Sequence, residues 1–325
     1  MKFAIMATGW IAERMAETVT PLPEVEKYAV ASRSLEKAEA FAKQWGFEKA
    51  YGSYEELVQD PEVELIYVAT PHSHHYECGK LCLENGKPAL IEKAFCVNAK
   101  QARELIALSK EKGVFLCEAF WTRFIPARKL VEDVLAQGTI GEVTAMLAQF
   151  GAALEYRERM VKPELAGGAL LDLGVYTINF ALMFAGSEVK SISSAAVLTP
   201  EGVDRVNSVT LTFENGCLAL LNSNMSSNAH NRGIIYGREG RIEVNNTNNF
   251  DSIKVFDKDG VLVRDVEIPA QITGYEYEVL ACMKAIAEGK PECEEMPHSE
   301  TIRLMEIMDE ARAQWGMRYP GENLT

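Results

Sequence analysis

The sequence predicts a chain of two domains, an α/β domain with a parallel sheet followed by an α+β domain with a large, mostly antiparallel open sheet. In residues 1–120, short apolar strands alternate with amphipathic helices, which is typical of a parallel sheet covered by helices on both faces. In residues 188–266, strand-like runs follow one another with turn signals between them, which is typical of antiparallel pairing. We therefore expect domains at residues 1–120 and 121–325.

The elements of the first domain follow from apolar periodicity and from residues that begin or end a helix. Ser34 is a good N-cap for the helix that follows it, and Gly46 is a good residue to end that helix. Gly86 ends another helix in the same way. We expect strands at residues 3–6, 28–32, 65–69, 89–91 and 114–118, and helices at 10–18, 35–46 and 98–113. A further helix follows the strand at 65–69 and ends at about residue 85.

The second domain shows a different order of elements. A polar loop leads into a long apolar helix, and turn sequences such as ENG at 214–216 separate the strands that come after it. The pattern predicts an open antiparallel sheet with helices on one face. We expect a strand at 143–151 and helices at 126–137, 167–186, 275–288 and 298–315.

The composition is that of an ordinary globular protein, with 47% hydrophobic and 25% charged residues among 325. The formal net charge is −14, and such an acidic surface repels phosphate backbones, so we expect no nucleic-acid partner. No apolar stretch reaches the roughly 18 consecutive residues of a membrane span, so we expect no membrane partner. A strand-like pattern begins at Lys2, which leaves no room for a signal peptide.

Seven cysteines are scattered along the chain, and several lie within apolar runs. An odd number without regular spacing predicts reduced, mostly buried thiols and a cytoplasmic protein. Cys78 and Cys82 lie four residues apart and close to three histidines, which could be interpreted as a metal cluster. Buried cysteines at helical spacing explain the pair better, and we therefore expect no metal site.

Open α/β sheets bind ligands at the carboxyl ends of their strands, so the residues after each strand carry the functional prediction. After the first strand comes ATGWIA (7–12), where a dinucleotide-binding fingerprint would have glycine in place of Ala7. Gly9 would let the backbone approach a pyrophosphate, and Ala7 serves at the turn if its φ stays negative. One glycine between a strand and a helix is also common in other proteins. The candidate cofactor residues are Thr8, Gly9, Trp10 and Ile11.

The second strand ends in ASRS, with Lys37 one helical turn further on. A site that prefers NAD usually has an acidic residue here to accept the ribose 2′-hydroxyl, and this sequence has none. Ser32, Arg33 and Lys37 instead offer hydrogen-bond donors and positive charge to a 2′-phosphate. A solvated helix start is the alternative. The sequence therefore favours NADP over NAD.

Two later strands also end in polar residues. ATPHSHH (69–75) holds three histidines, of which we expect His74 to be solvated while two could reach a cofactor. Lys93 ends the next strand, where it could hold a substrate hydroxyl or lower the pKa of a neighbouring acid. A loop whose histidines bond to the backbone is the alternative. The further cofactor candidates are Thr70, Pro71, His72, His75, Glu92 and Lys93.

The order and spacing of several motifs along nearly the whole chain resemble one protein family. The motifs are the small-x-Gly-x-Ile-Ala turn, VATPHSHHYE, the strand end IEK and GGALLDLGVY. Together they are similar to the Gfo/Idh/MocA oxidoreductases, the family of glucose–fructose oxidoreductase and inositol dehydrogenase. The stretch CEAFWTRFIP, with GGALLDLGVY after it, resembles more closely the trans-dihydrodiol dehydrogenases and their D-xylose dehydrogenase relatives.

The resemblance implies a dinucleotide-binding Rossmann domain and a second domain whose sheet often forms a dimer interface, so we expect a homodimer or homotetramer. The family's lysine falls on Lys93, and its D-x-G-x-[YH] element falls on Asp172, Gly174 and Tyr176. Asp172 and Tyr176 are four residues apart, which places them on one face of a helix. The resemblance thus implies Lys93, Asp172 and Tyr176 as the catalytic residues.

The resemblance also implies a reaction, hydride transfer between NADP and a secondary alcohol or carbonyl of a sugar, polyol or cyclic diol. Tyr176 would take the hydroxyl proton, Lys93 would favour the phenolate, and Asp172 would orient the substrate or the lysine. The alternative is a non-catalytic NADP-binding sensor or scaffold of the same fold. Trp121 and Phe150 are candidate aromatic walls for the substrate or simple core residues, and Arg123 and Tyr275 are weaker candidates for cofactor contact.

Two positions depart from the family's pattern. Ala94 stands where proline usually follows the lysine, and a cis peptide is disfavoured before any residue other than proline, so Lys93 could be placed differently. Thr144 falls where the dihydrodiol enzymes place a substrate arginine, so we expect a substrate other than theirs.

Overall fold

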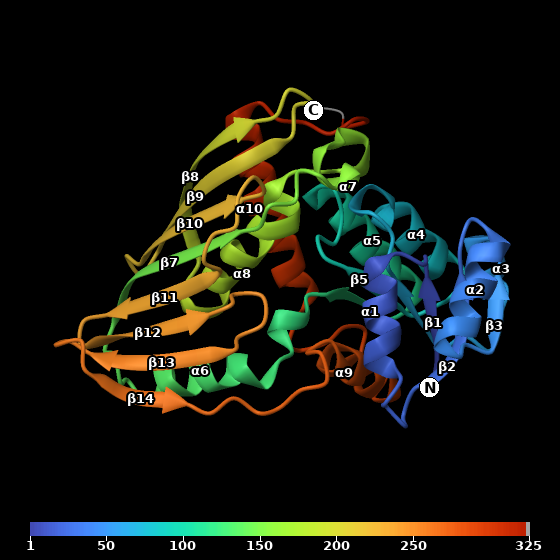
Figure 1. Cartoon of the computed structure of the whole chain (residues 1–325), viewed down its shortest axis with the longest axis horizontal. Helices are drawn as coiled ribbons and strands as arrows, with labels where there is room; N and C mark the ends of the chain where they lie inside the picture. Colours follow the sequence, from blue (N-terminus) through green and yellow to red (C-terminus); the bar gives the residue numbers. More distant parts are fainter. Residues whose placement is uncertain (323–325) are drawn as a thin grey trace. The chain divides into compact units, whose positions relative to one another are not determined.

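The parallel sheet belongs to the first of two units of the computed structural model, which describes residues 1–322 (Figure 1). Six strands pair in the order β3-β2-β1-β4-β5-β6, all parallel. The order reverses between β1 and its neighbour β4, and ligands of such sheets bind at this switch point. The strands are β1 (Lys2–Met6), β2 (Glu26–Ala31), β3 (Lys49–Tyr51), β4 (Leu65–Val68), β5 (Ala89–Glu92) and β6 (Leu116–Ala119).

Helices of the first unit begin and end where the side chains predict. The Ser34 hydroxyl accepts a hydrogen bond from Lys37 N at the start of α2, and Gly46 ends that helix with φ 76°. Asn98 and Gly113 do the same for α5. The helices that connect the strands are α1 (Trp10–Val19), α2 (Leu35–Trp45), α3 (Tyr54–Gln59), α4 (His72–Glu84) and α5 (Ala99–Lys112).

The first unit also includes a segment from late in the chain, Gln271–Met305, so the predicted division at residues 120 and 121 needs correction. This segment carries α9 (Glu276–Ala287) and the start of α10 (His298–Trp315). Leu116 in β6 explains the association, because its N–H donates to Pro291 O at 3.1 Å and its carbonyl contacts His298 Nε2 at 2.8 Å. The second unit comprises Ile125–Ala270 and the chain from Glu306 on.

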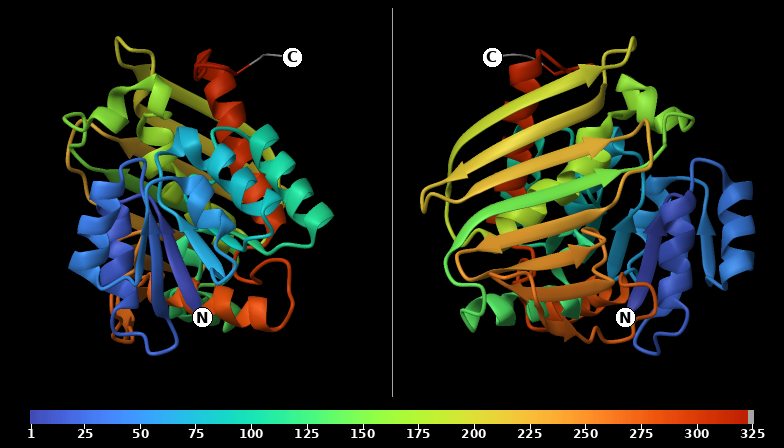
Figure 2. Two further views of the ribbon diagram at one scale, coloured as in Figure 1. Left: turned by 90° about the vertical axis from the view of Figure 1, so that its right-hand side faces the viewer. Right: turned by 60° about the vertical axis from the view of Figure 1, so that its left-hand side comes forward.

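The second unit is built on an eight-stranded sheet in the order β14-β13-β12-β11-β7-β10-β9-β8 (Figure 2). Only β7 and β10 pair in parallel, so the predicted, mostly antiparallel sheet is confirmed. The strands are β7 (Val143–Gly151), β8 (Val189–Leu198), β9 (Asp204–Phe213), β10 (Leu218–Asn224), β11 (Arg232–Gly237), β12 (Gly240–Asn245), β13 (Ser252–Asp257) and β14 (Leu262–Val266).

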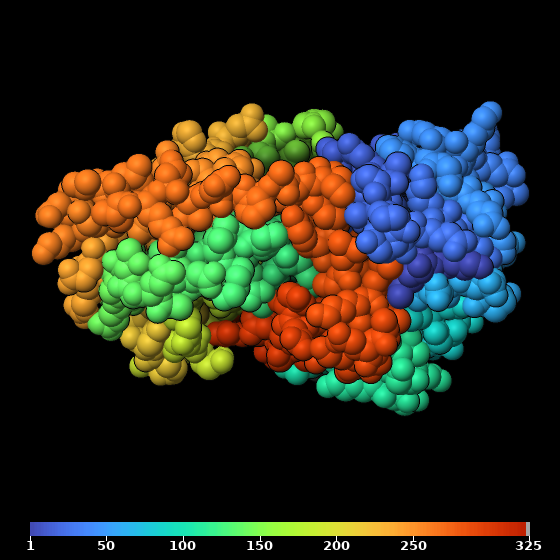
Figure 3. Space-filling model, turned by 90° about the horizontal axis from the view of Figure 1, so that it is seen from below, coloured from blue at the N-terminus to red at the C-terminus, as the bar shows by residue number. Residues whose placement is uncertain are grey.

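Helices cover the second sheet from one side. The apolar helix α8 (Val175–Phe184) packs against β7, β10 and β11, and the end of α10 packs on β8, where Gln314 Nε2 donates to Ile192 O at 3.1 Å. At the β14 edge, Arg264 Nη1 donates to Gln137 Oε1 at 3.2 Å, just after α6 (Pro126–Ala136). The space-filling view shows the green surface of α6 beside the orange strands (Figure 3).

The predicted long helix over 167–186 is interrupted. Leu170–Gly174 forms a π-helical segment, η3, and regular α-helix begins only at Val175. Within residues 1–322, Pro163–Phe184 is the one helical stretch long and apolar enough to span a membrane, but 94% of its apolar window is buried inside the protein. Its apolar character is therefore explained by its place in the core of the second unit.

Candidate active site

In the turn between β1 and α1, Ala7 adopts a left-handed backbone conformation that is typical of glycine. Ala7 has φ 88°, so the expectation of a negative φ is wrong. Its N–H donates to Ala31 O at 2.9 Å, which holds the turn against the end of β2. A left-handed alanine costs roughly 1–2 kcal/mol. No side chain caps α1, so the first amide groups of this helix are available to an anion such as a pyrophosphate.

The space around that turn is open, as the prediction for Gly9 requires. A Cβ atom at Gly9 would meet no heavy atom within 4 Å, and the Trp10 side chain next to it is 58% exposed. Gly9 itself has φ −82°, so its conformation does not require glycine. Its lack of a side chain therefore serves access to the amide groups of α1 rather than the turn geometry.

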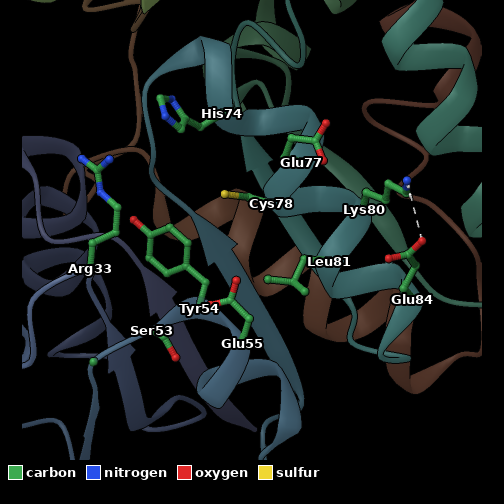
Figure 4. A pocket seen from close by; sticks show the side chains of 11 residues that line it. Arg33, Ser53, Tyr54, Glu55, His74, Glu77, Cys78, Lys80, Leu81 and Glu84 are labelled. Atoms are coloured by element: carbon green, nitrogen blue, oxygen red, sulfur yellow. Dashed lines mark ion pairs between the residues drawn. The ribbon is translucent and has the colours of Figure 1, made fainter.

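A pocket of about 560 Å³ lies in the first unit after the end of β2. Arg33 lines it, together with Tyr54 from α3 and His74 from α4 (Figure 4). His74, expected to be solvated or bonded to the backbone, is half-buried, and burial and the nearby Arg33 charge lower its pKa. Of the three residues predicted to bind a 2′-phosphate, only Arg33 lines this pocket.

The other two of those residues support the loop. The Ser32 hydroxyl is buried and accepts a hydrogen bond from Ser34 N at 3.4 Å, while Lys37 is exposed on α2. Tyr54 could not be found from the sequence, because α3 and the preceding β3 are short and lack a periodic pattern. Lys80 also lines the pocket but is paired with Glu84 at 3.9 Å, so Arg33 is the residue of the predicted three that offers a charge to a 2′-phosphate there.

His75 ties together the loops that follow β4 and β5. Its ring is buried, with Nε2 at 2.8 Å from Thr70 O and Nδ1 at 2.8 Å from Ala94 O. Burial lowers the pKa of His75 to about 4, so the ring is neutral and donates to one carbonyl at a time. Both nitrogens are occupied, which leaves none for a cofactor or a metal. His72 packs edge-on against this ring.

Lys93 directly follows β5, and the buried side chain of Glu92 fixes its backbone. Its N–H donates to Glu92 Oε2 at 3.1 Å, and the Tyr67 hydroxyl donates to Glu92 Oε1. Glu92 and Tyr67 are both buried. Burial and the Glu92 carboxylate raise the pKa of Tyr67 well above its ordinary value, so it remains a donor. The Lys93–Ala94 peptide bond is cis, with alanine in the place of the family's proline.

Trp121 and Arg123, which follow β6, each have a partner inside the first unit. The Trp121 ring stacks on Tyr275 with centroids 4.1 Å apart and an interplanar angle of 1°. Arg123 is buried and its Nη2 lies 2.6 Å from Glu300 Oε2. Glu118, which sequence reasoning did not single out, lies close by, and burial raises its pKa to about 7 against the opposing charge of Arg123. These contacts fix the two side chains within the first unit, and their roles at the substrate and the cofactor stay predictions.

In the second unit, the structure brings together Asp172, Tyr176 and Phe150. Asp172 lies in the π-helical segment, Tyr176 lies one turn later in α8, and both are almost fully buried. The Phe150 ring, from β7, lies 5.8 Å from the Tyr176 ring. Phe150 thus adjoins the predicted catalytic tyrosine, as a wall for the substrate would. Thr144, earlier in the same strand, contacts Tyr236 O at 3.4 Å.

Arg159 completes this group and was not foreseen. Its Nη1 lies 2.9 Å from Asp172 Oδ1, and its Nη2 lies 3.2 Å from Oδ2, which is a bidentate ion pair. The arginine comes from α7 (Glu158–Val161), in the polar loop before the π-helical segment. It is one of several charged residues in that loop, and no motif distinguishes it from the others.

A buried carboxyl group holds the start of the π-helical segment. Asp204 Oδ2 accepts hydrogen bonds from Leu170 N at 2.8 Å and from Asn207 Nδ2 at 2.7 Å. Burial raises the pKa of Asp204 to about 7. Gly168 has φ 116°, and a Cβ there would lie 2.2 Å from Asp204 Oδ1, so the second glycine of GGALLDLG leaves room for this carboxyl group.

Family models match both parts of the chain. Residues 1–120 match the model described as "Oxidoreductase family, NAD-binding Rossmann fold", and residues 129–243 match the "GFO/IDH/MocA C-terminal domain". Among curated proteins, the trans-1,2-dihydrobenzene-1,2-diol dehydrogenase of Danio rerio is 35% identical over 334 residues, which cover 98% of each chain. The Homo sapiens protein of the same name is 33% identical over 328 residues, again with 98% of each chain covered.

Solved structures agree with this relationship. KijD10, a 3-ketoreductase from Actinomadura kijaniata crystallised with NADP and TDP-benzene, is 26% identical, with a TM-score of 0.86 over 96% of this chain and 97% of that chain. An aldose-aldose oxidoreductase from Caulobacter crescentus, 20% identical, shares the fold with a TM-score of 0.85 over 98% and 99% of the two chains. The chain therefore belongs to the Gfo/Idh/MocA family of oxidoreductases, with an NAD-binding Rossmann domain.

Proposed function

We propose that this protein is an NADP-dependent oxidoreductase that transfers hydride between the nicotinamide and a secondary alcohol or carbonyl of a sugar, polyol or cyclic diol. The observation that carries the proposal is the group in the second unit, where Asp172 is held by Arg159 one turn before Tyr176. A buried tyrosine beside an oriented carboxylate suits a reaction in which a hydroxyl group gains or loses a proton.

NADP is the proposed cofactor because of the residues around the end of β2. Arg33 lines the pocket there, and ASRS provides no carboxylate to accept a ribose 2′-hydroxyl. The uncapped start of α1 suits the pyrophosphate. KijD10, which is similar to this chain in fold, was crystallised in complex with NADP. The cofactor, when bound, accepts hydride from the carbon that bears the hydroxyl group, or returns hydride to it.

The chain's own residues would move the proton. A free tyrosine has a pKa of about 10 and is a poor base at neutral pH, so Tyr176 needs a positive charge that favours its phenolate. The family resemblance assigns this charge to Lys93, which follows β5 and whose N–H donates to Glu92. Asp172, fixed by Arg159, would orient the substrate hydroxyl through a hydrogen bond. Phe150 would give the ring of the substrate an apolar wall.

Turnover with a panel of sugars, polyols and cyclic diols tests the substrate class. We expect reduction of NADP with at least one member of the panel, which contains trans-1,2-dihydrobenzene-1,2-diol, named for the curated relatives, as the comparison compound. We expect NADP to support a higher kcat/KM than NAD. Tight NADP binding without turnover on the whole panel would contradict an enzymatic role, and equal use of both cofactors would contradict the role of Arg33.

Two substitutions test the assigned roles. Lys93→Met and Tyr176→Phe should each lower kcat by roughly 10²–10⁴-fold, the usual contribution of a positioned acid or base. If both residues act in one reaction, the double variant should be hardly slower than either single variant. Additive losses, or full turnover by Lys93→Met, would exclude this mechanism.

We also propose a cytoplasmic homodimer or homotetramer that associates through the uncovered face of the second sheet. Thr210, Leu220, Leu147 and Ile234 lie opposite one another in four adjacent strands and line a shallow pocket of about 270 Å³. Leu147 and Leu220, at the apolar centre of this row, are 37% and 47% exposed, and neighbouring exposed apolar side chains are typical of a subunit interface. All seven cysteines are free thiols, as expected in the cytoplasm.

A further inference from the structure

Three cysteines from distant parts of the sequence meet inside the first unit. Their Sγ atoms all lie within 4.8 Å of one another, and those of Cys282 and Cys293 are 3.7 Å apart. Cys117 lies in β6, Cys282 lies in α9, and Cys293 follows α9. All three are buried. Among residues 1–322 this is the one group of three or more such side chains close enough to hold a metal ion.

A buried acid adjoins the three thiols. Glu278 precedes Cys282 by one turn of α9, so the two side chains share a face of the helix. Its side chain is fully buried, and neither carboxylate oxygen has a hydrogen-bond partner among the described residues. The carboxyl group is within electrostatic reach of Cys117 and Cys293. A buried carboxyl group without partners is costly, and an ion that the structure does not contain is one explanation of such a group.

His298, whose charge acts on Cys293, already has contacts of its own. His298 Nε2 contacts Leu116 O at 2.8 Å, and its Nδ1 lies 3.2 Å from Glu292 Oε2. The available donors are therefore three sulfur atoms and one carboxylate. Hard cations such as Mg²⁺ and Ca²⁺ prefer oxygen ligands only, whereas Zn²⁺ prefers thiolates and accepts a carboxylate as a fourth ligand.

We propose that Cys117, Cys282 and Cys293 bind one Zn²⁺ ion, with Glu278 as the fourth ligand. A Zn–S distance of about 2.3 Å in a tetrahedral site corresponds to about 3.8 Å between sulfur atoms, close to the 3.7 Å between Cys282 and Cys293. Cys117 Sγ lies within 4.8 Å of both of these sulfur atoms, and the Glu278 carboxylate would have to move toward them to complete the site. The thiols lose their protons to solvent as the ion binds, and no oxidation or reduction is involved.

The proposed site is structural. Its four ligands leave no open position for a substrate, and they connect β6, α9 and the segment between α9 and α10. That segment, residues 288–297, has no regular helix or strand, and local opening there gives an ion access to Cys293. Zinc would therefore stabilise the association of Gln271–Met305 with the parallel sheet, independently of the proposed oxidoreductase reaction.

The test is a zinc titration of the reduced, metal-free full-length protein against a chromogenic chelator, together with thermal unfolding. We expect one Zn²⁺ per chain and a higher Tm with zinc. Cys293→Ala and Glu278→Gln should each weaken zinc binding, the cysteine variant by more than the roughly 10–100-fold that loss of an outer contact costs. Cys96→Ala is the matched control, because Cys96 is buried in the same unit but outside the cluster.

Two results would overturn the proposal. One is a wild-type protein that takes up no zinc at micromolar free metal, and the other is undiminished zinc binding by Cys293→Ala. Should the variants fail to fold, the wild-type protein titrated with Cd²⁺ decides, since thiolate ligands give an ultraviolet charge-transfer absorption. An intensity that corresponds to three thiolates per ion supports the site, and an absent band excludes it.

Discussion

Arg159 holds the Asp172 carboxylate through a bidentate ion pair. Arg159→Met removes both hydrogen bonds to the carboxylate, and charged hydrogen bonds of this kind contribute about 1.5–3 kcal/mol. We expect kcat/KM to fall roughly 10–100-fold while NADPH binding is unchanged. Steady-state kinetics and cofactor titration measure the two effects.

The conservative variant separates orientation from charge. Arg159→Lys keeps the positive charge but cannot form the bidentate pair, so it should recover only part of the activity. Full recovery by lysine would mean that charge alone matters. An unchanged kcat/KM in Arg159→Met would show that Asp172 does not depend on this partner.

Ala7 gives a prediction of opposite sign, a stabilising substitution. Ala7→Gly removes the strain of a left-handed alanine. Because glycine also raises the entropy of the unfolded chain, part of this gain is lost, and we expect a net stabilisation of about 1 kcal/mol. Chemical unfolding measures this change. Ala12→Gly in α1 is the control and should destabilise by about 1 kcal/mol. Destabilisation by both would show that alanine is unstrained at residue 7.

The π-helical segment is the element of the second unit whose stability should depend on pH. Asp204, which binds Leu170 N, has a pKa raised to about 7 in the folded protein, against 3.8 for an ordinary aspartate. Between these values the unfolded chain gives up a proton that the folded chain keeps, so stability falls as pH rises through this range. At lower pH both states are protonated and the loss disappears.

Asp204→Asn resembles the protonated carboxyl group and removes this titration. We expect wild-type stability to fall by about 1–3 kcal/mol from pH 4 to pH 7.5, and the variant to show a smaller fall. Urea unfolding at several pH values measures it, with the exposed Asp265→Asn as control. Identical pH profiles for wild type and Asp204→Asn would show that Asp204 does not titrate in this range.

At the scale of elements, the sequence predicts what strong periodicity and caps can reveal. Buried strands such as β4 and capped helices such as α2 lie within a few residues of their predicted bounds. β3 and α3 were missed, because three and six residues are too few for a periodic pattern. The π-helical turn in GGALLDLG could not be predicted, since it depends on Asp204, 34 residues after Leu170.

The candidate site follows the same rule. The strand-end motif singled out Lys93 and the family resemblance singled out Asp172 and Tyr176, but partners from distant segments such as Arg159 and Tyr54 carry no local signal. His75 shows the limit most clearly. A histidine near a cofactor-binding loop suggests chemistry, yet its ring binds two backbone carbonyls, and only the packing of two loops determines that.

At the scale of the whole molecule, the uncovered face of the second sheet predicts the state of assembly. Leu220→Glu places a charge in the middle of the apolar row, where the side chain is 47% exposed. We expect the protein to dissociate toward monomers, with at least about a 10-fold weaker association, because a buried unpaired charge is unfavourable. Light scattering coupled to size-exclusion chromatography measures the mass.

The matched control lies at the edge of the same sheet. Leu262 in β14 is 46% exposed and lies outside the row, so Leu262→Glu should leave the mass unchanged. A monomeric wild-type protein, or equal dissociation of both variants, would exclude this face as the interface. The division into units could not be read from the sequence, because Gln271–Met305 joins a sheet completed more than 150 residues earlier.

The left-handed Ala7 has a consequence for how such proteins are found. A motif search that requires the first glycine of the fingerprint would miss this chain, although Ala7 has the left-handed conformation that glycine would adopt there. The left-handed conformation is thus present without the glycine that adopts it most easily. Turns of this kind are therefore better recognised by their backbone dihedral angles than by their sequence motif.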